Sequence, residues 1–347
     1  MRGNTLPQLT WRWTKVNDVE APLTDETMTP YPNGSARHGE ALDPGLEEAL
    51  RNSPHGISKL LLEENEQHAN VRRRVVLKNG RSEEMKVVLD TDSTALIDRY
   101  QVICEAGQRG ELLLEVVALA EAAQRNAVIQ IVARPDSTLR LMLVQRLNET
   151  SGANVSVIVQ VEKGARVEVA HVDLGGRFSN FHYGCDLIGK GAETDISTVY
   201  LADGDEKLDL FYNVRHIGEN TRSEIQVNGA LLDRAHKSFR GTLDFLEGAC
   251  GAEGNEEEYA VLLSDQVHSI AVPLLLCHED DVMGNHAASA GRIDEEMLFY
   301  IMSRGFGRKE AASLIVEARM TPTLDRISNE SVREEVRRQI HERIVQG

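Results

Sequence analysis

One histidine stands apart among the residues that could do chemistry. His286 lies between small neighbours, with Gly284 before it and Ala287, Ala288 and Ser289 after it. Such neighbours leave an imidazole accessible beside a ligand or an interface, and neutral imidazole is a common metal ligand. A single histidine seldom holds a metal by itself. The residues alone therefore favour a structural role for His286 and leave metal binding as the alternative.

The four cysteines form no metal-binding pattern. Cys104, Cys185, Cys250 and Cys277 are far apart in the sequence and include no Cys-x-x-Cys pair. In a reducing compartment they would be free thiols, and the ordinary interpretation of each is a small buried hydrophobic residue. His278 follows Cys277 directly, and adjacent side chains of a strand point to opposite faces, so we do not expect these two residues to share a metal.

The sequence motifs of several catalytic classes are missing or incomplete. Residues 184–190 fit the first part of a Walker A motif, but Gly191 stands where a P-loop needs Ser or Thr. Strand-like alternation resumes at Thr194, so this segment is expected to be a turn that binds no ATP. The sequence has no Gly-x-Ser-x-Gly elbow, no His-Glu-x-x-His and no EF-hand loop.

Composition narrows the classes of partner. The chain of 347 residues carries 38 Lys and Arg against 55 Asp and Glu, a net charge of −17. Such an acidic surface repels phosphate backbones, so no nucleic acid partner is expected. The aromatic share of 5% argues against a sugar-binding cleft. No apolar run has the length of a signal peptide or of a membrane span, which needs roughly 20 residues. We therefore expect a cytoplasmic protein that does not enter a membrane.

The elements that position these residues are expected to be mainly β-strands. Over an expected core of residues 70–291, apolar and polar residues alternate with period two in short segments that end at Gly or Asp/Asn turns, as at residues 155–161 and 208–214. One helical interruption is expected at residues 111–125, where apolar residues recur at helical spacing. The pattern fits a sandwich, a barrel or a β-solenoid. Repetition over roughly 200 residues favours the solenoid, because a single sandwich closes sooner.

The N-terminal part differs from this core. Residues 1–69 are expected to form a loop-rich arm with short helices at residues 45–51 and 57–69. The aromatic pair Trp11 and Trp13 is expected to anchor this arm on the body of the protein.

Residues 292–347 are expected to form a C-terminal helical domain, preceded by a buried strand at residues 272–276. Asp294 is a good N-cap for its first helix, and Gly305 is a good C′ residue for the end of that helix. The apolar stripes expected on the following helices are Ala311, Leu314, Ile315 and Ala318, and then Val332, Val336, Ile340 and Ile344, with Pro322 as a break between them.

The sequence also resembles a known family. Residues 282–289, 291–296 and 298–305 look like the C-terminal signature of the SufB/SufD family, whose members are scaffold components of the SUF iron–sulfur cluster assembly machinery. Further similarity is found at residues 6–7, 10–17, 221–229, 239–244, 251–254 and 262–265. The resemblance implies a right-handed parallel β-helix core with a C-terminal α-helical domain.

Within this family the sequence is more similar to SufD-like than to SufB-like members. SufB-like members have a cysteine in the segment that corresponds to residues 256–260, which contains none here, and they have glutamates beside the signature histidine, where this chain has Asn285 and Ala287. The resemblance implies that His286 faces a SufB-like paralogue, or a second copy of this chain. There it would hold iron of a nascent iron–sulfur cluster together with partner residues. No cofactor is then expected to be stably bound.

The resemblance implies an ATPase partner as well. Residues 292–347 would dock a SufC-like ABC ATPase, and the residues expected to take part are Asp294, Leu298, Phe299, Tyr300, Arg304 and Gly305. The chain would be a non-catalytic scaffold subunit that assembles clusters and hands them over. Two other interpretations remain open, a structural homodimeric β-helix protein without a metal role and a polysaccharide-acting β-helix enzyme.

Overall fold

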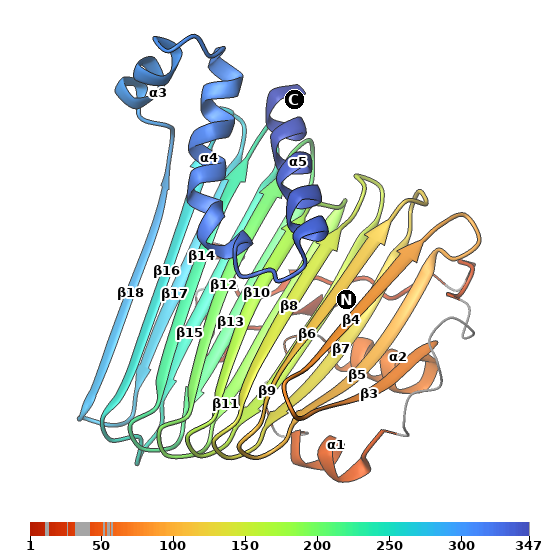
Figure 1. Cartoon of the computed structure of the whole chain (residues 1–347), viewed down its shortest axis with the longest axis vertical. Coiled ribbons are helices and arrows are strands. Elements are labelled where there is room, and N and C mark those ends of the chain that lie inside the picture. Colours follow the sequence, from red (N-terminus) through yellow and green to blue (C-terminus); the bar gives the residue numbers. More distant parts are fainter. Residues whose placement is uncertain are drawn as a thin grey trace.

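Two parallel β-sheets make up most of the molecule (Figure 1). The computed structural model describes residues 1–10, 14–25, 27–31, 42–50, 53, 56 and 58–346. Trp11 and Trp13, which we expected to be anchors, lie outside the described residues. The strands of the two sheets are β3 (Val71–Leu77), β4 (Arg81–Leu89), β5 (Ala95–Cys104), β6 (Arg109–Ala118), β7 (Gln124–Ala133), β8 (Thr138–Arg146), β9 (Gly152–Val161), β10 (Arg166–Leu174), β11 (Phe178–Leu187), β12 (Glu193–Ala202), β13 (Lys207–His216), β14 (Arg222–Leu231), β15 (His236–Phe245), β16 (Ala252–Leu262), β17 (His268–Cys277) and β18 (Val282–Gly291).

Each coil of the chain contributes one strand to each sheet. The odd-numbered strands form one 8-stranded sheet and the even-numbered strands form the other, both in chain order. Paired residues of neighbouring strands are between 26 positions apart, as Gly152 and Phe178 are, and 32 positions apart, as His236 and His268 are. Two strands therefore complete one turn, and about eight turns stack into a parallel β-solenoid. The sequence prediction of a mainly β solenoid is confirmed.

The prediction of a helix at residues 111–125 is wrong, because this segment belongs to β6, a turn and β7. Leu112 and Val116 are buried from β6, whereas Leu119 is exposed in the turn. A spacing of four residues satisfies both the helical period and the strand period of two. The apparent helical pattern was therefore a pair of inward strand positions followed by a turn residue.

The main core lies between the two sheets. It is built from the inward-facing aliphatic side chains of almost every strand, together with large buried aromatic residues such as Tyr183, Tyr200 and Tyr212. Because alternate side chains of a strand point to opposite faces, each sheet also has an outer face. Helices cover part of each outer face.

Part of the outer face of the odd-numbered sheet is covered by the N-terminal arm, which contains β1 (Arg2–Gly3), β2 (Val19–Glu20), α1 (Pro44–Leu50) and α2 (Lys59–His68). Both expected short helices are formed. Leu50 and Leu61 pack against Val128 of β7. The arm is also held by charge, because Arg240 of β15 pairs with buried Asp209 and donates a hydrogen bond to the carbonyl oxygen of Asn4 at 2.6 Å.

The C-terminal part consists of α3 (Glu295–Met302), α4 (Arg308–Leu324) and α5 (Glu330–Gln346). α4 and α5 lie against the outer face of the even-numbered sheet, whereas α3 stands beyond the end of β18 (Figure 1). Asp294 caps α3 by accepting hydrogen bonds from the backbone N–H groups of Glu296 and Met297. Gly305, at φ +101°, lies two residues after the C-cap Ser303, one position later than expected.

The apolar stripe expected on α4 is formed only in part: Ala311 is buried and Ile315 is half-buried, whereas Leu314 and Ala318 are exposed and Val316 and Met320 complete the buried face. Pro322 does not end the helix, which continues to Leu324. A proline near the helix end removes few hydrogen bonds, so the last turn tolerates it.

The stripe expected on α5 is largely confirmed, because Val336, Ile340 and Ile344 are buried against the sheet and Val332 packs beside them. None of the helices in the described residues combines the length with the apolar composition that a membrane crossing needs.

Candidate functional site

The last coil of the solenoid has no further coil stacked on it among the described residues. β17 and β18 are terminal strands, so among the described residues each pairs with a neighbouring strand of its sheet on one side only. The strand expected at residues 272–276 is formed, but its side chains are half-buried rather than buried because no further coil covers them. Such an edge presents unpaired backbone N–H and C=O groups to another chain. We call the face formed by β17 and β18 the open end.

His286 is exposed in the middle of β18, in register with Glu256 of β16. Residues in register on parallel strands place their side chains on the same face of the sheet. Glu256 faces the interior, where its carboxyl group lies against β15 so closely that a Cβ at Gly241 would come within 2.0 Å of Oε2. His286 therefore occupies an inward-facing position at the open end.

Gly284, the preceding inward position of β18, supports this placement. A Cβ at Gly284 would come within 2.3 Å of Leu275 and 3.0 Å of Phe245, and Phe245 belongs to the main core. These side chains close the interior next to the His286 position. The imidazole thus stands at the boundary between the sealed core and the open end.

A charged cluster lies inside the solenoid, one coil below His286. The Lys237 ammonium is 2.7 Å from Oε1 of Glu258, and the Tyr200 hydroxyl donates a hydrogen bond to the same oxygen at 3.1 Å. Glu256, two residues earlier, is 1% exposed, and within the described part of the chain neither of its carboxyl oxygens has a hydrogen-bond partner. A polar group buried in this way lowers stability unless another interaction compensates it.

Burial controls the protonation of this cluster. Burial, reinforced by the negative charge of Glu258, raises the pKa of Glu256 to about 8, so this carboxyl group is mostly protonated at pH 7. Burial also lowers the pKa of Lys237, while the nearby Glu258 acts in the opposite direction. Sequence analysis missed both glutamates. Strand alternation could have found them, because it puts them on the same face as the apolar Ala252 and Ala260.

The cysteines divide into two groups. Cys104 and Cys185 are buried as expected, and burial raises the pKa of both thiols. Cys250 and Cys277 are exposed, so the expectation of four buried cysteines is wrong for these two, which lie in and beside the poorly covered last coil. The Glu279 side chain accepts a hydrogen bond from the Cys250 thiol and raises its pKa.

A second candidate surface surrounds α3. Phe299 is 73% and Tyr300 59% exposed. The Arg304 guanidinium lies 5.0 Å from the centre of the Tyr300 ring and donates a hydrogen bond to its hydroxyl group. Leu298, by contrast, is 3% exposed and packs inside the molecule, so among the expected docking residues it supports α3 rather than presenting a surface. We call Phe299, Tyr300 and Arg304 the α3 face.

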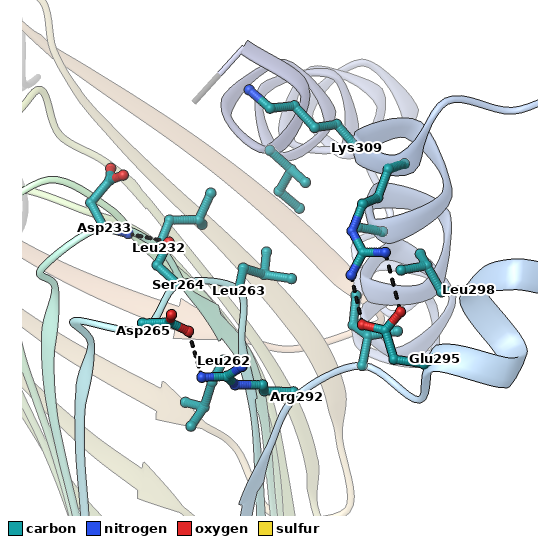
Figure 2. Close-up of a pocket in the computed structure, with 14 residues that line it drawn as sticks. Leu232, Asp233, Leu262, Leu263, Ser264, Asp265, Arg292, Glu295, Leu298 and Lys309 are labelled. Carbon is teal, nitrogen blue, oxygen red and sulfur yellow. Dashed lines mark hydrogen bonds and ion pairs between the residues drawn. The ribbon is translucent and has the colours of Figure 1, made fainter. Parts of the chain in front are cut away.

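A pocket of about 430 Å³ lies beneath α3, between this helix, α4 and the ends of β14 and β16. Figure 2 shows Arg292 paired with Asp265 on one side of it and Glu295 on the other. Glu295 forms an ion pair with Arg308 of α4. Leu298 lines the same pocket. The two ion pairs are exposed, so each contributes little to stability.

No three His, Cys, Asp or Glu side chains of the described residues converge as a metal site. Fold and site thus define a parallel β-solenoid protein with an open terminal coil, one accessible imidazole in that coil, and an exposed aromatic helix beside it. Residues 87–319, more than half of the chain, match the family model of the SufBD core domain of the SUF system for FeS cluster assembly. The chain belongs to the SufB/SufD family, which supports a role in iron–sulfur cluster assembly.

Individual relatives agree with this assignment. The chain is 32% identical over 151 residues to the iron–sulfur cluster assembly protein SufD of Bacillus subtilis, an alignment that covers 44% of this chain and 35% of the relative. It is 24% identical over 236 residues to a SufBD family protein of Mycobacterium leprae, covering 67% of this chain and 27% of the relative. A SufBD family protein of Staphylococcus saprophyticus is 26% identical over 236 residues, or 51% of its length. The chain thus spans about half or less of these relatives.

Proposed function

We propose that this chain is a SufD-like, non-catalytic scaffold subunit of a SUF iron–sulfur cluster assembly complex. It pairs through the open end with a SufB-like paralogue, and His286 binds iron of the nascent cluster at the resulting interface. The observation that carries this proposal is the position of His286, exposed at an inward-facing position of a terminal strand that is paired on one side only among the described residues. A second copy of this chain is the alternative partner.

The chemistry of the site supports a transient cluster, which is cargo rather than a resident cofactor. Imidazole binds iron, and replacing thiolate ligands by histidine changes the properties of an iron–sulfur cluster. The described residues contain no group of three or more potential metal ligands around His286. In this proposal the partner therefore supplies the remaining ligands, such as thiolates. A cluster held across two subunits is released when the interface opens.

The α3 face is proposed to dock a SufC-like ABC ATPase. Phe299 and Tyr300 are large, exposed aromatic residues on a helix that stands clear of both sheets (Figure 1). Aromatic and arginine side chains are enriched at protein interfaces. α4 and α5 are different, since their apolar faces already seal the even-numbered sheet. The docking surface is therefore α3, and deleting the whole helical domain would damage the solenoid itself.

The polysaccharide-acting alternative has less support. Sugar-binding grooves usually need exposed aromatic rings, yet the large exposed aromatic residues among those described, Phe299, Tyr300 and Phe306, lie in α3 and just after it. They do not follow a groove along the sheets.

The test is co-expression of the chain with a SufB-like protein and a SufC-like ATPase. The native mass of the purified complex is measured, and its iron and sulfide are counted. His286→Ala should give a complex of the same mass that has lost most of its iron and sulfide. His278→Ala is the matched control, because His278 is also an exposed imidazole but lies beside Asp244 at the turn after β17.

Unchanged iron and sulfide in His286→Ala would refute the ligand role. A complex that contains two copies of this chain and no SufB-like subunit would replace the heterodimer by the homodimer. Failure of the chain to join any such complex would refute the scaffold function.

A further inference from the structure

The buried carboxyl group of Glu256 has no role in the fold that accounts for its presence. The neighbouring Glu258 accepts contacts from Lys237 and Tyr200. Glu256 is 1% exposed, and neither of its oxygens has a hydrogen-bond partner among the residues that the structure describes. The residue in register on β14 is Ile225, which is apolar. An aliphatic side chain would therefore suit this position better, since an unpartnered buried polar group is unfavourable.

Among the described residues, the coil that follows Glu256 in the stack is the last one, and it carries His286 next to Glu256 on the same face of the sheet. The two residues are in register on β16 and β18, and neighbouring strands lie about 4.8 Å apart. Oxygen and nitrogen ligands bind transition metals at about 2 Å. A carboxylate and an imidazole that point the same way from adjacent strands can therefore reach one ion between them.

The surroundings leave space for the carboxyl group and close the site on its inner side. Glu256 reaches the facing sheet at Gly241, where any larger residue would collide with its Oε2. Leu275 and Phe245 fill the space beside Gly284. Of the two side chains, the exposed imidazole of His286 is the one that faces the open end.

We propose that Glu256 and His286 together bind one divalent transition-metal ion, Fe²⁺ in the proposed function, as two ligands from this single chain. Mixed oxygen and nitrogen ligands suit Fe²⁺, Mn²⁺, Co²⁺ and Zn²⁺, whereas Ca²⁺ prefers oxygen ligands alone. The inference rests on the proposed function and extends it, because this chain alone then holds an iron ion before a partner completes the cluster site.

The test uses the purified full-length chain without partners and Co²⁺ as the probe. Binding is followed by calorimetry and by the visible absorption of the bound ion. Glu256→Gln and His286→Ala should each weaken Co²⁺ binding at least about tenfold. The double variant should bind at least as weakly as the weaker single variant, but its loss should be smaller than the product of the two single losses, because two ligands of one ion are not additive. Glu257→Gln is the matched control, since its carboxylate is on the same strand but exposed on the opposite face, and it should bind as the wild type does.

Three results would overturn the pair: wild-type affinity in Glu256→Gln, wild-type affinity in His286→Ala, or wild-type binding no tighter than that of the double variant. Glu256→Met serves as a second variant if Glu256→Gln is not folded by circular dichroism, and the same loss of Co²⁺ binding is expected. The outcome is separable from that of the proposed function. Normal Co²⁺ binding in Glu256→Gln together with loss of the cluster in His286→Ala would refute only the metal-binding pair. Weakened Co²⁺ binding in Glu256→Gln together with an unchanged cluster in His286→Ala would refute only the cluster role of His286.

Discussion

Replacing Glu256 with methionine should stabilise the protein, and the gain should grow as the pH rises. Methionine has a similar length and no polar atoms to bury. In the folded protein, burial and the charge of Glu258 raise the pKa of Glu256 from its ordinary 4.5 to about 8. The folded state therefore holds this proton more tightly than the unfolded state does. Stability is lost as the pH rises above the unfolded pKa, and the loss is complete above the folded pKa.

The size of the effect follows from the two pKa values. One pKa unit corresponds to about 1.4 kcal/mol, so, relative to low pH, ionisation of this carboxyl group in the unfolded state lowers the free energy of unfolding by less than about 1 kcal/mol at pH 5 and by about 4 kcal/mol at pH 8. The difference in the free energy of unfolding between Glu256→Met and wild type should thus increase by about 3 kcal/mol over this range. A constant contribution from methionine packing adds to it without changing the pH dependence.

Urea unfolding of both proteins at several pH values from 5 to 8 measures this difference. Titrating groups that do not interact with Glu256 cancel because they are present in both proteins. Glu257→Met is the control, since its exposed carboxylate should give a difference that does not vary with pH. A Glu256→Met difference that stays constant within about 1 kcal/mol across this range would refute the assignment of a strongly raised pKa.

Three further predictions concern the edges, the arm and a buried histidine. Met283→Lys adds a charge to exposed β18. In a pull-down with the proposed partners it should weaken binding of the SufB-like subunit but not of the ATPase. Phe299→Ser should weaken binding of the ATPase but not of the SufB-like subunit. Arg240→Met leaves Asp209 without its buried ion pair and should lower the free energy of unfolding by about 3–5 kcal/mol in urea. Burial lowers the pKa of His216 from 6.5 to about 4, so wild type should lose up to about 3 kcal/mol relative to His216→Phe as the pH falls from 6.5 to 4.

Each of these predictions has an outcome that contradicts it. Loss of both partners in Met283→Lys, or in Phe299→Ser, would mean that the two surfaces are not separate. Arg222 pairs with Glu253 at the surface, so a loss in Arg240→Met as small as that in Arg222→Met would show that burial of the Arg240 pair is unimportant. A pH-independent difference between wild type and His216→Phe would contradict the lowered pKa.

The fold could be predicted from the sequence because the period of two is a local property of every coil. The same locality explains the failures. In residues 111–125, a spacing of four residues fitted two structures, and only pairing with β4 and β8 decides between them. β18 is rich in Ala, Gly and Ser, which have little preference for strands, and it is a strand because its backbone pairs with β16. A single sequence does not contain that partner information.

The candidate site was predictable only in part, for the same reason. His286 was identified from its small neighbours and from the family resemblance. Glu256 was missed because nothing near it in sequence connects it with His286, which is 30 positions away and becomes its neighbour only through the register of β16 and β18. The exposure of Cys277 likewise depends on the solenoid ending after β18, a property of the stack and not of the residues around the thiol.

The uncovered final coil also bears on the tendency of copies of this chain to associate with one another. Its backbone groups accept any extended peptide of matching direction, including the same edge of a sibling molecule. Copies whose edge is not covered by another chain would then be prone to cluster. In a solenoid, the end of the stack and not its length sets this risk.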